Sequence, residues 1–134
     1  MRKRILVVED DIDFIELLKF NLAKAGFSIA VASDGAEGLK KARSLHPDLI
    51  LLDLMIPELD GLRVCEILRR EPATARLPII FLTAMSSELG KMACLAAGAN
   101  DFISKPFSPK NLLTRIQAAL EGTAASCAVE AVKA

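Results

Sequence analysis

The sequence DLILLD at residues 48–53 places an aspartate directly after four consecutive aliphatic side chains. An uninterrupted leucine and isoleucine run is typical of a strand in a parallel sheet that is covered on both faces. Acidic residues also follow an earlier aliphatic run, at Glu9, Asp10 and Asp11, and Lys105 follows a later one. Because parallel strands end at the same edge of a sheet, these charged side chains are expected to converge there.

Short apolar runs alternate with helical patterns along the whole chain, which favours an α/β protein. The strands are expected at residues 4–8, 28–32, 48–52, 78–83 and 101–104. Short loops and right-handed crossovers leave few topologies for such a chain, and strand order 2-1-3-4-5 is common at this size. We therefore predict a flavodoxin-like, doubly wound (βα)5 fold with a five-stranded parallel sheet.

Capping residues mark several of the expected helix ends. Gly26 and Gly98 are predicted to end the first and fourth helices, because glycine readily adopts the left-handed conformation found there. Asp60 is predicted to begin the third helix, and Ser108 to begin the fifth. The residues expected to face the core from the first and last helices are Ile15, Leu18, Leu22, Leu113, Ile116 and Leu120.

Composition predicts one domain and argues against some kinds of partner. The chain has 134 residues, 52% of them hydrophobic, which suits one domain at 1–121 followed by an Ala-rich tail or linker start at 122–134. The formal net charge is zero and basic residues form no block, so direct nucleic-acid or anionic membrane binding is not expected. No apolar run approaches the roughly 20 residues of a membrane span, and we expect a cytoplasmic protein.

The cysteines give no sign of a metal site or a disulfide framework. Cys65, Cys94 and Cys127 are odd in number and lack the spacing of metal ligands, and His46 is the single histidine. We therefore expect reduced, mostly packed thiols.

Three carboxylates, those of Glu9, Asp10 and Asp53, are expected to meet between the first and third strands. Each pair at 4 Å repels by about 4 kcal/mol at an effective dielectric near 20, so a cation is needed. The three carboxylates are too few to surround Ca²⁺, so the site favours Mg²⁺, which keeps several water ligands. Mg²⁺ can also neutralise an incoming phosphoryl group that is attacked by a carboxylate. Thr83 and Lys105, at the ends of the fourth and fifth strands, are placed to bind phosphoryl oxygens.

Four segments together resemble the receiver domain of two-component response regulators. They are ILVVEDD at 5–11, DLILLDLMIPELDG at 48–61, PIIFLTA at 78–84 and GANDFISKPF at 98–107, within a similarity that covers about residues 3–121. The resemblance implies that Asp53 accepts a phosphoryl group from the phosphohistidine of a sensor histidine kinase or phosphotransfer protein. It implies a signalling switch that carries an aspartyl phosphate, not a multiple-turnover enzyme on an external substrate.

The resemblance also implies a set of Mg²⁺ ligands. Asp10, Asp53 and the carbonyl of Met55 would hold the ion directly. Glu9 would act through metal-bound water, and it stands where many relatives have aspartate.

A conformational switch is the third implication of the resemblance. Thr83 and Lys105 would contact the phosphoryl group, and Phe102, where many relatives have tyrosine, would be the aromatic switch residue. The surface of the fourth helix, fifth strand and fifth helix would then change to control an output partner or domain. The peptide bond between Lys105 and Pro106 would be cis.

Rival functional classes fit the residues less well. A flavin-binding protein of this fold would need a Ser/Thr/Gly-rich phosphate loop where this chain has Glu9, Asp10 and Asp11. A phosphatase with an aspartyl nucleophile would usually have a second aspartate at the position of Met55. A receiver-like scaffold that is never phosphorylated stays open as an alternative, although such modules typically lose an acid or the lysine.

The output stays open at this point, including whether the chain is a stand-alone receiver or part of a longer regulator. In the receiver domains of regulators that resemble winged-helix transcription factors, charged pairs on the surface of the fourth helix, fifth strand and fifth helix form a dimer interface. This chain offers Lys91, Asp101 and Arg115 there, but Asn100, Asn111 and Gln117 are neutral. This pattern argues against a DNA-binding regulator, while a homodimer through the same surface stays open.

Overall fold

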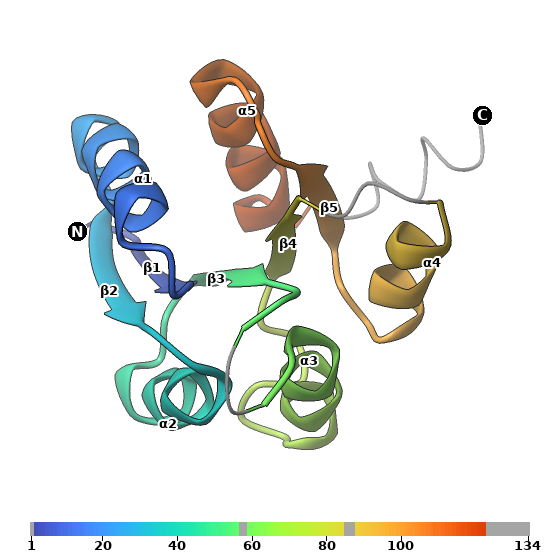
Figure 1. Ribbon diagram of the computed structural model, residues 1–134. Coiled ribbons are helices and arrows are strands. Elements are labelled where there is room, and N and C mark those ends of the chain that lie inside the picture. The colour runs from blue at the N-terminus through green and yellow to red at the C-terminus, as the bar shows by residue number, and fades with distance from the viewer. Residues whose placement is uncertain (1, 57–58, 85–87, 123–134) are drawn as a thin grey trace.

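Five parallel strands form one sheet in the order β2-β1-β3-β4-β5, as predicted (Figure 1). The computed structural model describes residues 2–56, 59–84 and 88–122. Strands and helices alternate strictly along the chain. Their bounds are β1 Arg4–Val8, α1 Ile12–Lys24, β2 Ser28–Ala32, α2 Gly35–Leu45, β3 Leu49–Asp53, α3 Gly61–Arg70, β4 Ile79–Thr83, α4 Glu88–Ala96, β5 Asp101–Ser104 and α5 Pro109–Leu120.

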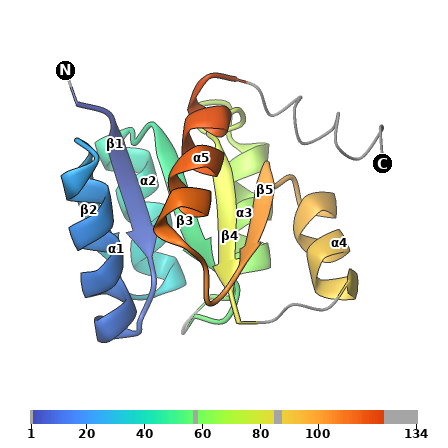
Figure 2. The same cartoon turned by 90° about the horizontal axis from the view of Figure 1, so that it is seen from above.

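The sheet is the central layer between two layers of helices (Figures 1 and 2). Successive side chains of a strand point to opposite faces. In β1, Ile5 and Val7 pack in the core under α1 and α5, whereas Leu6 and Val8 pack in the core under α2, α3 and α4. Two buried faces explain why the strands read as continuous aliphatic runs.

Three of the five predicted strand ranges, those of β1, β2 and β5, agree with the structure. The predicted range 48–52 is wrong by one residue, because Asp53 is still a strand residue and pairs with Leu82 of β4. The predicted range 78–83 begins one residue early, since Pro78 has no N–H to donate to a ladder. Asp53 is therefore held by the sheet itself and not by a loop.

Helix ends follow the capping predictions. Gly26 and Gly98 adopt positive φ angles of 97° and 108° just after α1 and α4. The side chain of Asp60 accepts a hydrogen bond from the N–H of Arg63, and Ser108 caps α5 in the same way. These caps fix where the helices enter and leave the edge of the sheet.

The predicted core faces of the two terminal helices are partly correct. Leu18 and Leu22 of α1 are fully buried, and Ile15 is half-buried. In α5 the buried residues are Leu112, Ile116 and Ala119, while the predicted Leu113 and Leu120 are half-buried at the margin of the same core. A small alanine allows α5 to pack closely, which hydrophobicity alone did not predict.

Two cysteines are packed as predicted. Cys65 of α3 and Cys94 of α4 are buried free thiols, and burial raises the pKa of each to about 11. Such thiols stay protonated at neutral pH and are poor nucleophiles. Cys127 and the predicted tail from residue 123 onward lie outside the described residues.

No helix among the described residues combines the length and the apolar character needed to span a bilayer.

A glycine at the start of α3 lets that helix approach the strand that carries Asp53. A Cβ on Gly61 would lie 2.6 Å from the Asp53 carbonyl oxygen and 3.0 Å from Leu54 Cα. Gly61→Ala is expected to lower the free energy of unfolding by about 1–3 kcal/mol, because these neighbours are backbone atoms that cannot move aside. Urea denaturation would measure this loss.

Gly38→Ala is the matched control for this prediction. Its new Cβ would meet only the Val8 side chain, at 3.0 Å, and a side chain can adjust. Alanine also gains helix propensity inside α2. An equal or larger loss in Gly38→Ala would contradict the special role of the α3 approach.

Candidate functional site

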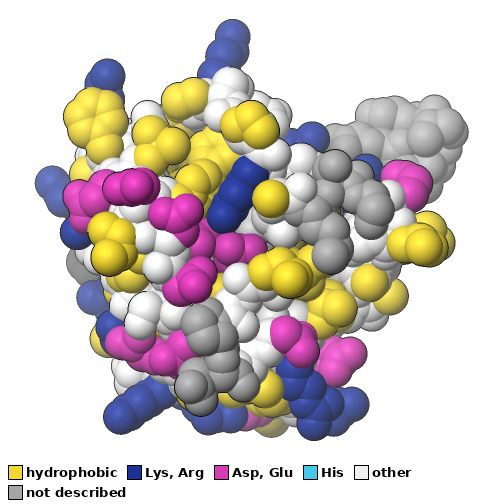
Figure 3. Space-filling view, viewed as in Figure 1, with side chains coloured by type: hydrophobic (Ala, Val, Ile, Leu, Met, Phe, Trp, Pro, Cys, Tyr) yellow, Lys and Arg dark blue, Asp and Glu magenta, His cyan; other side chains and the backbone are white. Residues whose placement is uncertain are grey.

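The predicted acidic residues converge at the carboxyl ends of neighbouring strands. Glu9 follows β1, Asp10 comes next, and Asp53 ends β3; one carboxylate oxygen of each lies within 4.8 Å of the other two. Glu9 is 2% exposed and Asp53 6%, whereas Asp10 is exposed. Acidic side chains are gathered at the centre of this face of the molecule, beside a basic one (Figure 3).

Lys105 supplies the positive charge of the site. Its Nζ donates hydrogen bonds to Glu9 Oε1 at 2.9 Å and to Asp53 Oδ2 at 3.2 Å. The lysine lies after β5, its backbone N–H donates to the Thr83 carbonyl at 2.8 Å, and its peptide bond to Pro106 is cis, as predicted. One ammonium therefore links the residue after β1, the last residue of β3 and the segment after β5.

Burial and charge act in opposite directions on the two partners of this ion pair. Burial raises the pKa of Glu9, although Lys105 and the N–H of Asp11 favour its charged form. Burial alone would lower the pKa of Lys105, but the hydrogen bond to Glu9 and the charge of Asp53 outweigh it and raise that pKa. The lysine stays charged as a result, and it faces more acids than it can neutralise.

The donor set fits a hard divalent cation. Three carboxylates supply oxygen ligands at short mutual distance, and the exposed Asp10 leaves the cluster open to solvent. The backbone N–H of Met55 donates to Asp53 Oδ1 at 3.1 Å, so the main chain of Met55 folds back against this carboxylate. A site that has only a few carboxylates and leaves room for water ligands suits Mg²⁺ better than Ca²⁺, which takes six to eight oxygen ligands.

Thr83 lies at the same edge of the sheet. It is the last residue of β4, one position beyond the residue that pairs with Asp53. Its side chain is fully buried. This is the position predicted for a group that contacts the phosphoryl oxygens.

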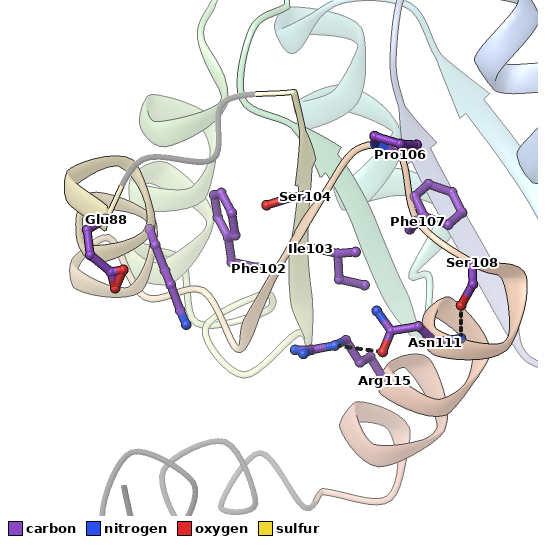
Figure 4. Close-up of a pocket in the computed structure, with 10 residues that line it drawn as sticks. Glu88, Phe102, Ile103, Ser104, Pro106, Phe107, Ser108, Asn111 and Arg115 are labelled. Carbon is purple, nitrogen blue, oxygen red and sulfur yellow. Dashed lines mark hydrogen bonds between the residues drawn. The ribbon is translucent and has the colours of Figure 1, made fainter.

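Phe102 lies in the interior. It is 8% exposed, faces Phe81 across the β4–β5 ladder, and belongs to the core that includes Cys94 of α4. It also lines a hollow of about 590 Å³ bounded by α4, β5 and the start of α5 (Figure 4). The predicted switch residue therefore connects the core with the predicted output surface.

Two contributors to the site were missed by the sequence analysis. The Phe14 ring lies 4.0 Å from Lys105 Nζ, and Asp11, predicted only as part of the acidic cluster, is the N-cap of α1. Asp11 accepts hydrogen bonds from the N–H groups of Asp13 and Phe14, while its own N–H donates to Glu9 Oε2. The sequence pattern that could have indicated this arrangement is Asp11, a residue type that favours helix N-caps, followed three residues later by the aromatic residue Phe14.

Two of the three neutral residues of the predicted output surface, Asn100 and Asn111, have side-chain partners within the domain. Asn100 Oδ1 accepts from Arg69 and from the N–H of Ile79, at 2.9 and 2.8 Å. Arg115 pairs with Asp101 at 2.6 Å and also donates to Asn111 Oδ1 at 3.4 Å.

Comparison with known proteins is unambiguous. The family model for the response regulator receiver domain matches residues 5–117. The chain belongs to this family. It is 46% identical over 120 residues to the alkaline phosphatase synthesis transcriptional regulatory protein PhoP of Bacillus subtilis, covering 90% of this chain and 49% of PhoP. It is equally identical over 120 residues to the DNA-binding response regulator MtrA of Mycobacterium tuberculosis, covering 90% of this chain and 51% of MtrA.

Solved receiver structures share the fold. Chemotaxis protein CheY4 of Vibrio cholerae aligns with a TM-score of 0.82 at 31% identity, covering 87% of this chain and 98% of that one. The receiver domain of sensor histidine kinase PA1611 from Pseudomonas aeruginosa aligns with a TM-score of 0.85 at 30% identity, covering 90% and 99%. The PA1611 structure has a magnesium ion coordinated in its active-site cleft.

The receiver spans about half the length of the curated relatives that it matches. Both relatives are transcriptional or DNA-binding regulators by name. The sequence argument against a DNA-binding regulator, which rested on neutral residues such as Asn100 and Asn111, is therefore not supported.

Removing the ammonium of Lys105 should destabilise the domain when no divalent cation is present. Lys105→Met leaves two buried carboxylates without their counter-charge, and allowing for the partial exposure of the lysine we expect a loss of roughly 1–3 kcal/mol. Urea denaturation in EDTA measures it. Adding Glu9→Gln should recover part of the loss, because it removes one buried charge.

Lys19→Met is the control for this experiment. Lys19 forms an exposed pair with Glu16 at 3.7 Å, and exposed pairs contribute little. An unfolding free energy for Lys105→Met that equals the wild-type value would contradict the assigned role of the ammonium.

Proposed function

We propose that this receiver domain is a Mg²⁺-dependent phosphorylation switch with Asp53 as its phosphoacceptor. The observation that carries the proposal is the placement of Asp53. Its carboxylate is nearly buried, is held by Lys105 on one oxygen and by the N–H of Met55 on the other, and lies beside Glu9 and Asp10. The phosphodonor is the phosphohistidine of a sensor histidine kinase or phosphotransfer protein.

The proposed transfer is an in-line displacement at phosphorus. A carboxylate oxygen of Asp53 forms the new P–O bond while the donor's N–P bond breaks, and the leaving imidazole keeps the electron pair. Lys105, already 3.2 Å from Asp53 Oδ2, is placed to bind a phosphoryl oxygen. The protein transfers the group to itself and then loses it to water, so it is not a multiple-turnover enzyme.

The metal site of the proposal consists of Asp10, Asp53 and the Met55 carbonyl, with Glu9 acting through water. Mg²⁺, when bound, would neutralise charge on the incoming phosphoryl group. The three acids of this set provide the cluster of oxygens that such an ion needs.

The proposed response uses Thr83 and Phe102. A hydrogen bond from Thr83 to the phosphoryl group would draw the end of β4 toward Asp53 and favour the inward position of Phe102. Phe102 has no hydroxyl that requires a partner when buried, so its inward position needs no compensating hydrogen bond. The surface of α4, β5 and α5 would then bind the output partner or a second copy of the domain.

Regulation of transcription is the output that we propose, because two relatives at 46% identity are regulators of that kind. The receiver would control this output through protein contacts. Its formal net charge of zero gives the chain no overall electrostatic attraction for DNA.

Acetyl phosphate with Mg²⁺ is expected to add one phosphate to the wild-type domain and none to Asp53→Asn, because asparagine is not a nucleophile for this transfer. Asp10→Asn should require a higher Mg²⁺ concentration, since it removes one of two direct carboxylate ligands. Intact-mass spectrometry over time provides both measurements.

Asp48→Asn is the matched control, because Asp48 directly precedes β3, at the end of the strand opposite Asp53, and its carboxylate accepts a hydrogen bond from the N–H of Arg4. It should behave as the wild type. Equal phosphate incorporation in Asp53→Asn and the wild type would refute the assignment of the phosphoacceptor.

Beryllofluoride, an analogue of the phosphoryl group, should reproduce the proposed conformational change. We expect NMR chemical-shift changes at Phe102 and along α4 and α5 on titration in the presence of Mg²⁺. Phe27, buried near the opposite edge of the sheet, should shift little and serves as the internal control. If the signals of Phe102 did not move while those around Asp53 did, the switch would have to be rejected.

A further inference from the structure

The ammonium of Lys105 is enclosed by an aromatic ring as well as by carboxylates. A lysine ammonium has three N–H donors. Two are used by Glu9 Oε1 and Asp53 Oδ2, and the ring of Phe14 lies 4.0 Å from the same nitrogen. This distance falls well within the range of a cation–π interaction, in which the negative face of the ring attracts a cation.

The ring of Phe14 is held from two sides. Phe14 lies in the first turn of α1, and its N–H donates to the capping oxygen of Asp11 at 3.2 Å. Its ring makes an edge contact with Phe107 at a centroid distance of 5.4 Å and an interplanar angle of 77°. Phe107 is two residues beyond Lys105, so the ring that contacts the ammonium is packed against the segment that carries it.

These contacts form a closed circuit around the site. The N–H of Asp11 donates to Glu9 Oε2 at 3.1 Å, and the Asp11 side chain caps the helical turn that contains Phe14. The Phe14 ring contacts Lys105 Nζ, which in turn donates to Glu9 Oε1. The position of the ammonium therefore depends on α1, which contributes no acid of its own to the carboxylate cluster.

We propose that Phe14 is a positioning residue for phosphoryl transfer and acts through Lys105. A lysine side chain is flexible and is held as a point charge, with no preferred plane. Asp53, one of the two carboxylates that hold the ammonium, is the group that attacks the incoming phosphoryl group, whereas the Phe14 ring takes no part in bond formation. The inference rests on the proposed function of Asp53 and assigns the ring a part in it.

The rate of phosphorylation by acetyl phosphate tests this inference. Phe14→Leu, which keeps an apolar side chain but removes the π face, should be phosphorylated about fivefold more slowly. Phe14→Tyr, which keeps the face, should retain most of the rate. Phe20→Leu is the matched control, because Phe20 belongs to the same helix, is 64% exposed and carries Lys24 at 5.6 Å from its ring.

A double-mutant cycle separates positioning from a general structural effect. Phe14→Leu should slow phosphorylation in the wild-type background but not in Lys105→Ala, because the ring then has no ammonium to hold. An equal slowing in both backgrounds, or failure of Phe14→Tyr to retain the rate, would overturn the inference.

NMR of the Lys105 side chain gives a readout that does not depend on transfer. Its ε-methylene protons should show an upfield ring-current shift that Phe14→Leu removes and Phe20→Leu does not. Absence of any phosphate on the wild-type domain would overturn the proposed function of Asp53. A wild-type rate in Phe14→Leu, with the wild type phosphorylated, would overturn the positioning role alone.

Discussion

The ion pair that Lys105 makes with Glu9 and Asp53 is the contact on which the carboxyl edge of the sheet depends. Each acid lies at the end of a buried strand. Removing one partner of a buried ion pair typically destabilises a protein by about 3–5 kcal/mol, because the other charge is left buried without compensation. The lysine reaches them from beyond β5. A single side chain thereby ties together segments that are 96 residues apart in sequence.

This arrangement is a compromise between folding and chemistry. One ammonium neutralises only part of the charge of three clustered acids, so the site keeps an excess of negative charge that a purely structural site would avoid. That excess is what makes the site receptive to a divalent cation. Departures from the best local stability of this kind are expected at functional sites, where the rest of the fold must offset them.

Much of the fold followed from aliphatic runs and capping residues, because burial on two faces and helix termination act locally. The end of β3 was misplaced because an aspartate rarely belongs to a buried strand, and only its pairing with Leu82 reveals that it does. Asp53, Asp10, Glu9 and Lys105 were brought together as topology requires. Phe14 was missed because a ring and an ammonium 91 positions apart meet only through the paths of their side chains.

The domain has two hydrophobic cores, one on each face of the sheet, and their side chains can change independently in evolution. Leu18 and Leu22 of α1 pack with α5 in one core, whereas Phe102 packs with α3 and α4 in the other. The sheet backbone is shared, but the side chains of the two cores are separated by it. A substitution that repacks α1 against α5 can therefore leave the packing of Phe102 against α3 and α4 unchanged, so each layer of helices can vary in evolution without disturbing the other.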